Sequence, residues 1–301
     1  MRLFYSICVL FSAWLANALA EPLPIDPLWK SETFRKSITA SYGIDSRIEP
    51  RITEDEAFYL EESAKAMAEN DRAKAIAALR GSSLLANSPA MLFTLASHLF
   101  ETGEAKDADE SVKLFESALT LFPNFRDAHR NLGVVLIQRE DFEEAKDHLV
   151  RALALGSQDG LTAGLLGYCH ARDGHHQAAL DAYRLAMLTQ PEERQWILGE
   201  AQALLALKRP REAASLLQSL LGGADLSTWL AQADAWNELD ESLAAAANLE
   251  IVHRAGGLEP DALLSLGHLY LQNDLPALAL ERYRAALAAA NPPSRTRAAR
   301  R

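Results

Sequence analysis

One stretch of the chain concentrates side chains that can bind a transition metal. It reads Cys169-His170-x-x-Asp173-x-His175-His176. Thiolate, imidazole and carboxylate groups hold zinc or copper in proteins. The stretch also fits a packing interpretation, in which Cys169 is a small residue beside Gly167 and His170 and His176 replace aromatic residues of a helical pattern. The packing interpretation is favoured, so we expect no metal here and no cofactor elsewhere.

Motifs for enzymatic chemistry are absent from the sequence. It contains no HExxH, GxSxG or CxxC motif and no glycine loop that would hold phosphate. The acidic runs Glu54-Asp55-Glu56 and Glu143-Glu144 fall where helices are expected to begin, and carboxylates there suit the helix dipole. No segment outside the repeats described below reaches the roughly 50 residues of a small domain. We therefore predict that the protein is not an enzyme.

A regular spacing of small residues predicts the elements that position these side chains. Glycine or alanine recurs with an alanine twelve residues later, in steps of 34, 34, 32 and 34 residues. A period of about 34 residues is typical of helix–turn–helix repeats. Small residues let two antiparallel helices approach closely, and larger apolar residues three or four apart form the stripe that packs on the next pair. The spaced pairs are Gly133 and Ala145, Gly167 and Ala179, Ala201 and Ala213, Ala233 and Ala245, and Gly267 and Ala279.

Extending this register in both directions predicts seven helix pairs. The first is degenerate and keeps only Ser63 and Ala75 at the spacing. The second aligns best when Ala96 meets Ser111, which predicts about three extra residues in the turn around Gly103–Glu110. The expected spans are 53–88, 89–125, 126–159, 160–193, 194–225, 226–259 and 260–293.

Three pairs carry a fuller pattern. The third reads Leu132-Gly133-x-x-Leu136 and then Ala145-x-x-x-Leu149-x-x-Ala152, and the fourth and the last repeat it around Leu166-Gly167 and Leu266-Gly267. Pro123 and Pro191 stand at the closing position of their repeats. Residues 53–293 resemble the tetratricopeptide repeat (TPR). The resemblance implies an all-α, right-handed superhelical solenoid of about seven repeats that binds protein partners without catalysis.

The first twenty residues are similar to a secretory signal. Arg2 precedes the mostly apolar run Leu3–Ala16, and Ala18-Leu19-Ala20 fits a cleavage site. We expect residues 1–20 to be a signal peptide, with an uncleaved membrane anchor as the alternative. Export to the periplasm or cell envelope follows, with no transmembrane segment after cleavage. Cys8 leaves with the signal, so Cys169 has no partner for an intrachain disulfide.

Residues 21–52 form an N-terminal extension that is too apolar for a pure linker. It either packs across the first helices or docks a partner. Its stretches Pro24–Leu28, Phe34–Lys36 and Tyr42–Pro50 resemble those of repeat proteins assigned to TonB–ExbB–ExbD energy-transducing systems. That resemblance implies an accessory role in an inner-membrane transport complex.

Two further predictions concern the C-terminal end of the chain, and a third concerns the kind of partner. Residues 294–301 include four arginines after Pro292 and Pro293, and we expect a basic, disordered tail. The last helix leaves Leu278, Leu280 and Leu287 without a polar capping helix, which predicts weak self-association through the C-terminal repeat. The formal net charge of −11 disfavours nucleic acid as a partner.

The first helices of the repeats are expected to line a mainly apolar groove that receives a protein segment. The groove lacks the paired lysines and asparagines of chaperone-binding repeats. We therefore predict an interaction scaffold in the periplasm or envelope. The alternative is a cell-wall or small-ligand binder that uses Tyr168, Trp229 and Trp236. The predicted groove residues are Phe93, Phe100, Arg130, Val134, Ile137, Tyr168, Arg172, Leu198, Gln202, Leu205, Asp234, Asn237, His268 and Leu271.

Overall fold

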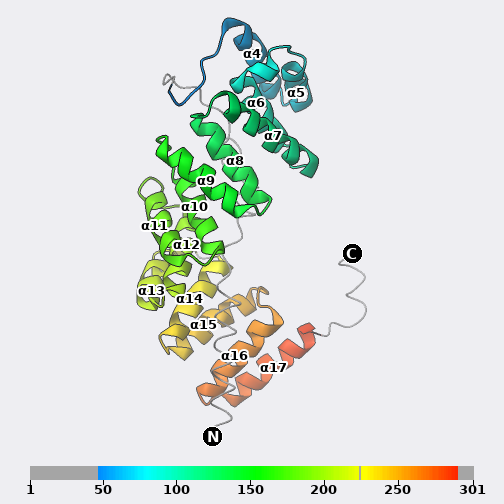
Figure 1. Cartoon of the computed structure of the whole chain (residues 1–301). Coiled ribbons are helices and arrows are strands. Elements are labelled where there is room, and N and C mark those ends of the chain that lie inside the picture. Colours follow the sequence, from blue (N-terminus) through cyan, green and yellow to red (C-terminus); the bar gives the residue numbers. More distant parts are fainter. Residues whose placement is uncertain (1–46, 224, 291–301) are drawn as a thin grey trace. The chain divides into compact units, whose positions relative to one another are not determined.

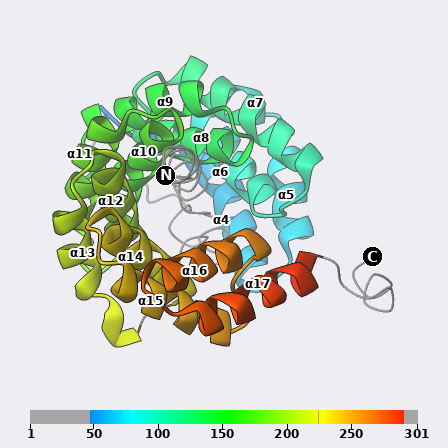
Figure 2. The same ribbon diagram turned by 90° about the horizontal axis from the view of Figure 1, so that it is seen from below.

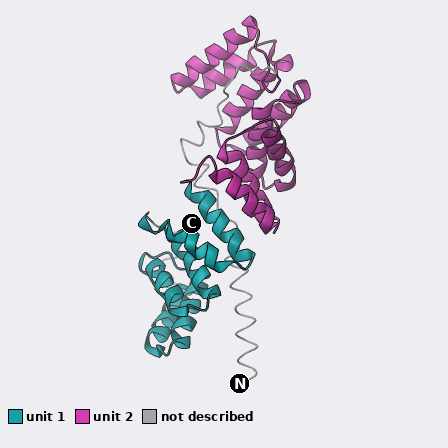
Figure 3. Ribbon diagram, turned by 90° about the vertical axis from the view of Figure 1, so that its left-hand side faces the viewer, with its two compact units in different colours: residues 1–22, 192–301 teal, residues 23–191 magenta. Residues whose placement is uncertain are grey.

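The computed structural model describes residues 47–223 and 225–290 (Figure 1). The chain divides after Pro191 into two compact units, coloured separately in Figure 3. We term their described parts the N-terminal unit (47–191) and the C-terminal unit (192–290). The predicted signal peptide, the extension up to residue 46 and the basic tail lie outside the described residues. Within them, no helix is both long and apolar enough to cross a membrane.

The N-terminal unit consists of helices in which each packs on the next along the chain. A short 3-10 helix, Leu85–Asn87, connects the first two pairs. The eight helices form four antiparallel pairs: α4 (Glu54–Ala68) with α5 (Arg72–Arg80), α6 (Pro89–Phe100) with α7 (Ala105–Leu121), α8 (Arg126–Gln138) with α9 (Phe142–Ala154), and α10 (Gly160–Arg172) with α11 (His176–Met187).

The C-terminal unit continues the same pattern with three pairs. They are α12 (Arg194–Ala206) with α13 (Pro210–Gln218), α14 (Leu226–Glu238) with α15 (Ser242–Arg254), and α16 (Pro260–Gln272) with α17 (Pro276–Ala290). The described residues thus form seven helix pairs and no strand, which confirms the predicted all-α fold of about seven repeats.

Turns between the two helices of a pair share one backbone feature. Each contains a residue with positive φ, from 58° at Lys208 and Asp274 to 74° at Gly174. This left-handed residue stands two places after the end of the first helix in six pairs and three places after it in the second pair. Only two of the seven residues are glycines, so glycine is not required to end these helices. The seven are Asn70, Gly103, Glu140, Gly174, Lys208, Asp240 and Asp274.

Close packing explains the small residues of the repeat. Ala145 and Ala179 are completely buried. A Cβ atom added at Gly167 would lie 2.9 Å from Cδ1 of Tyr183, and one at Gly133 would lie 2.9 Å from Cδ2 of Leu149. In both pairs the first helix touches the second at the residue four places after the predicted alanine, and at Gly133 the added atom would also lie 3.3 Å from the Ala145 carbonyl oxygen.

The second pair differs from the expectation. Ser111 does meet Ala96, and its hydroxyl donates to the Ala96 carbonyl over 2.9 Å. However, α6 ends at Phe100 and α7 already begins at Ala105, so the turn is short. The extra residues lengthen α7 to 17 residues, compared with 13 in α9. The prediction of a longer turn around Gly103–Glu110 was wrong because Ala105, Lys106 and Ala108 favour helix and Asp107 suits the dipole of its first turn, so these residues extend α7 instead.

The end of the N-terminal extension packs against the third pair. The backbone N–H of Arg126 donates to the Ile48 carbonyl over 3.2 Å. The guanidinium of Arg126 pairs with the Glu49 carboxylate at 3.0 Å, and Glu49 is only 5% exposed. Residues 48 and 49 therefore lie at the start of α8, two pairs beyond the helix that follows them in the chain. For this short part of the extension, the structure shows packing.

Candidate protein-interaction surface

Each unit has a face formed by the first helices of its pairs. In the N-terminal unit α4, α6, α8 and α10 contact one another in sequence, and in the C-terminal unit α12 contacts α14. Figure 2 shows α6, α8 and α10 on one side of their pairs and α7, α9 and α11 on the other. We term the first-helix side of each unit its inner face and the second-helix side its outer face. The predicted groove residues all come from first helices.

Six of the predicted groove residues are buried. Phe93 is completely buried, and its ring centroid lies 5.6 Å from that of Phe115 and 4.8 Å from that of Phe125. These six side chains belong to the core, so a partner does not reach them in this structure. They are Phe93, Phe100, Val134, Ile137, Tyr168 and Leu198.

The remaining eight predicted residues are at least partly accessible. Most of them are polar, so the inner face is more polar than the sequence suggested. The aliphatic and aromatic residues at the same register positions pack between neighbouring pairs instead. Arg130, Gln202, Leu205 and Asp234 are half-buried, whereas Arg172, Asn237, His268 and Leu271 are exposed.

Arg130 is held by the next helix of the same face. Its guanidinium lies 3.6 Å from the carboxylate of Asp159, which caps α10 by accepting from the Thr162 N–H over 2.7 Å. Burial alone would raise the pKa of Asp159, but hydrogen bonds from Ser157 and Thr162, with the Arg130 charge, hold it below its usual value. Asp159 therefore stays ionised and fixes Arg130.

The same arrangement recurs in the C-terminal unit, where Arg194 donates to the Thr228 hydroxyl over 3.0 Å. Asp225 caps α14 there by accepting from the Thr228 N–H over 2.9 Å. Sequence reasoning did not identify this contact. Its signal is the spacing Asp-x-x-Thr at the start of both helices, which is typical of an N-cap. Arg130 and Arg194 stand at different positions of their helices, yet each contacts the N-cap region of the next first helix and so holds two neighbouring pairs together.

Arg172 has a different environment at the other end of α10. Its guanidinium carbon lies 5.3 Å from the centroid of the Phe142 ring, and that ring packs edge to face with Tyr168 at 6.0 Å. The contact orients an exposed cation by a cation–π interaction. The Arg172 side chain is exposed, so its donors suit an acidic or carbonyl group of a partner.

Asp234 is the unusual acid of the C-terminal unit. Burial and the nearby charge of Glu238 raise the pKa of Asp234 to about 8. The folded state therefore binds a proton that the unfolded state, with a pKa of about 3.9, releases. Stability from this group is greatest below the unfolded pKa and is lost as pH rises through about 8.

Replacing Asp234 with asparagine is therefore expected to have a pH-dependent effect. At pH above 8, Asp234→Asn raises the free energy of unfolding by on the order of 1 kcal/mol, because it removes a desolvated charge; partial exposure keeps the effect modest. At acidic pH the two proteins have equal stability. Urea unfolding at both pH values measures this, with Asp261→Asn on the exposed side of α16 as control. A gain that is equal at both pH values would contradict it.

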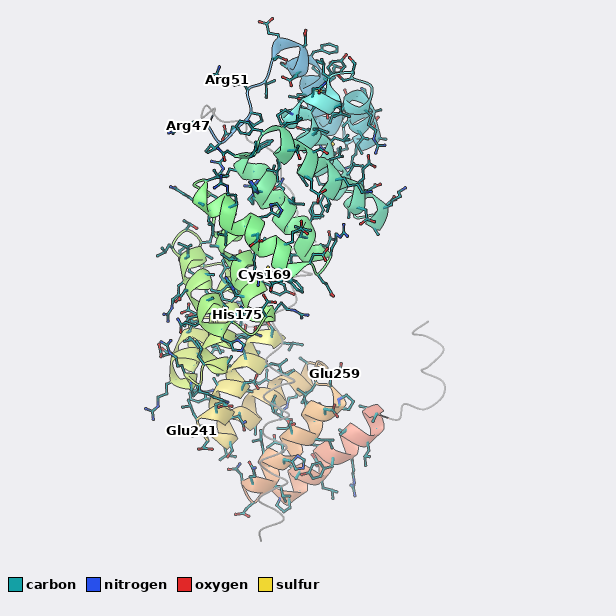
Figure 4. All side chains as sticks on the ribbon, viewed as in Figure 1. Arg47, Arg51, Cys169, His175, Glu241 and Glu259 are labelled. Carbon is teal, nitrogen blue, oxygen red and sulfur yellow. The ribbon has the colours of Figure 1, made fainter. Side chains whose placement is uncertain are left out.

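The cysteine–histidine stretch has the geometry of a packed helix end. Figure 4 places Cys169 within α10 and His175 in the turn that follows. Cys169 is completely buried, and burial raises the pKa of its thiol to about 12. Asp173 forms an ion pair with Lys146 of the preceding pair. Within the described ranges, no three His, Cys, Asp or Glu side chains gather in a group that could hold a metal ion.

The aromatic residues of the alternative function also lie in packing positions. Tyr168 is only 9% exposed. Trp236 packs against a buried cluster that includes Leu266 and Tyr270 of the next pair. Trp229 is partly buried. Two of the three rings, Tyr168 and Trp236, therefore take part in packing.

Comparison with known proteins agrees with this architecture. Residues 104–167, from the start of α7 into α10, match the family model of the tetratricopeptide repeat. A tetratricopeptide repeat protein from Parabacteroides merdae is 14% identical, with a TM-score of 0.54 over 80% of this chain and 96% of that one.

Two further solved structures are similar. YrrB, described as a TPR protein with an unusual peptide-binding site, is 17% identical, with a TM-score of 0.52 over 74% of this chain and 97% of its own. The pilF protein of Pseudomonas aeruginosa is 21% identical, with a TM-score of 0.54 over 68% of this chain and 93% of its own. Residues 104–167 therefore match the tetratricopeptide repeat by sequence, and the helix pairs as a whole have the fold of solved tetratricopeptide-repeat structures.

Proposed function

We propose that the protein is a non-catalytic scaffold of the cell envelope that holds a partner protein on its inner faces. The fold itself is that of protein-interaction scaffolds. The observations that carry the site are exposed first-helix residues in each unit: Arg172 in the N-terminal unit, and Asn237, His268 and Leu271 in the C-terminal unit. Acidic side chains of a partner would suit the inner face of the N-terminal unit, and polar and apolar ones would suit that of the C-terminal unit.

The proposal also specifies where the protein is located and which complex it joins. The signal-like residues 1–20 support export to the periplasm or envelope. The resemblance of the extension to TonB–ExbB–ExbD accessory proteins supports a partner in that transport system. Packing of Ile48 and Glu49 on α8 agrees with an extension that belongs to the repeat region. The exposed residues of the inner faces are mostly polar, which suits a segment of such a partner that lies in the periplasm.

Binding is expected to depend on the inner face and not on the outer one. Arg172→Glu reverses the exposed cation, and Leu271→Asp removes an apolar contact that is 53% exposed. Each is expected to lower recovery of a crosslinked partner from envelope extract about tenfold, the loss typical of one well-placed contact. The matched control is Val150→Glu on the outer face of α9, where Val150 is 51% exposed. Melting curves check that all three variants stay folded.

Two results would count against the proposal. Equal recovery by the inner-face variants and by the control would show that the partner binds elsewhere. Failure of the wild-type chain to recover any protein would reject the scaffold role itself. Absence of TonB, ExbB and ExbD from the recovered proteins would reject only the transport-system assignment.

A further inference from the structure

Helix α4, the first described helix, exposes a side chain at a position that is buried in interior helix pairs. The residue five places before the packing small residue is completely buried in four interior first helices, namely Met91, Ala128, Thr162 and Thr228. In α4 the same position is Phe58, which is 61% exposed. Interior pairs cover this position because a preceding pair packs there. Phe58 is therefore placed to contact a helix pair that the described chain does not supply.

The last described helix has the complementary feature. Leu280 directly follows the packing residue Ala279 and is 49% exposed, whereas Ala246, at the same position in the preceding pair, is 1% exposed. Leu287, on the same side of α17, is 64% exposed. A following pair would cover these positions.

Charge distinguishes the two ends. In the C-terminal unit, Glu250 bridges to the following pair: its carboxylate accepts from the Tyr270 hydroxyl over 3.2 Å and lies 3.5 Å from the Arg282 guanidinium. Arg284 is exposed and lies one turn from both Leu280 and Leu287 on α17. Its charge would suit acidic groups on a partner surface.

The exposed side of α4 has that charge. Glu54, Asp55 and Glu61 are exposed within one turn of Phe58. Glu62 and Lys65 pair with each other at 2.8 Å, so they add no net charge. We term Glu54, Asp55, Phe58 and Glu61 the head face. Leu280, Arg284 and Leu287, on one stripe of α17, form the tail face. The head face offers one aromatic ring among carboxylates, and the tail face offers leucines around an arginine.

We propose that the tail face of one copy binds the head face of a second copy, so that α4 packs where the first helix of the next pair would lie. Phe58 then contacts the exposed leucines, and Arg284 lies near the carboxylates of α4. This contact joins two different surfaces, so each bound copy retains one free head and one free tail. Association continues to longer assemblies as concentration rises.

Two variants that each disable one face test the proposal. Phe58→Glu adds a charge to the head, and Leu280→Glu adds one to the tail; both positions are exposed, so the fold is expected to survive. Sedimentation velocity of the wild-type chain is expected to show larger species as concentration rises. Each variant alone is expected to be a monomer. Their equimolar mixture is expected to form a dimer and nothing larger, because one intact tail meets one intact head.

The matched control is Val150→Glu, which adds the same charge on the outer face of α9. This variant is expected to associate like the wild-type chain. A wild-type protein that stays monomeric at every soluble concentration overturns the proposal. So does association of Phe58→Glu alone, which would indicate tail-to-tail contact, or a mixture of the two variants that remains monomeric. Circular dichroism confirms the helical content of each variant.

Discussion

Gly167→Val is expected to lower the free energy of unfolding by about 3 kcal/mol, the upper range for added bulk in a packed core. A Cβ atom there would stand 2.9 Å from Cδ1 and 3.0 Å from Cε1 of Tyr183. The Tyr183 ring is itself only 3% exposed, so it has little space to move away. Helices α10 and α11 must therefore separate. Urea unfolding followed by circular dichroism measures the loss.

The matched control for this change is Gly222→Val. It adds the same atoms where a Cβ would meet no atom within 4 Å. Its effect is expected to stay within about 0.5 kcal/mol, as for ordinary surface substitutions. A Gly167→Val protein as stable as the control would show that α10 and α11 do not pack as closely as the repeat register requires.

Phe93→Ala is expected to destabilise the protein by about 4 kcal/mol, as for other buried aromatic residues replaced by alanine. Phe93 is completely buried between the rings of Phe115 and Phe125, which belong to α7 and the start of the third pair. Its removal leaves a cavity at the junction of two pairs. Unfolding in urea measures the change.

An exposed phenylalanine provides the comparison for Phe93. Phe58→Ala, at a side chain that is 61% exposed, is expected to change the stability of dilute protein by less than about 0.5 kcal/mol. If Phe93→Ala instead weakened partner binding and left stability unchanged, the core position of Phe93 would be wrong and the sequence-based assignment to the binding surface would stand.

The helix pairs were predictable because their cause is local. A small residue and an alanine twelve residues later must face each other for two short antiparallel helices to pack, and this constraint is visible in the chain itself. Even the degenerate first pair follows it, since Ser63 and Ala75 are both completely buried. Spacing also revealed the extra residues between Ala96 and Ser111. It did not reveal that they extend α7, because helix propensity decides whether such residues enter the turn or the helix.

The candidate surface was less predictable, for a geometric reason. On a first helix, residues that face a partner and residues that pack on the neighbouring pair alternate at the same three- and four-residue spacings. Val134 and Arg130 lie four residues apart, yet Val134 is completely buried and Arg130 is half-buried. The angle between successive pairs decides which of them is covered. That angle depends on contacts such as Arg130 with Asp159, which join residues of different pairs.

The end faces could be recognised only by comparing register positions across pairs. The sequence indicated that Leu278, Leu280 and Leu287 lack a cap, and the structure adds their exposure, between 37% and 64%. It also adds Phe58 at the opposite end, which the sequence pattern did not single out. From the sequence, a phenylalanine at this position is expected to pack against a preceding helix pair. The structure shows instead that Phe58 is 61% exposed.

Site-specific photocrosslinking in living cells can test whether a partner protein binds the inner faces, because it reports which face contacts the partner. A photoreactive amino acid replaces Arg172 or Asn237 on the inner faces, or Val150 or Ile251 on the outer faces, where Val150 and Ile251 are 51% and 41% exposed. We expect a discrete adduct with another protein from the inner-face positions and none from the outer-face positions. Adducts confined to Val150 and Ile251 would contradict it.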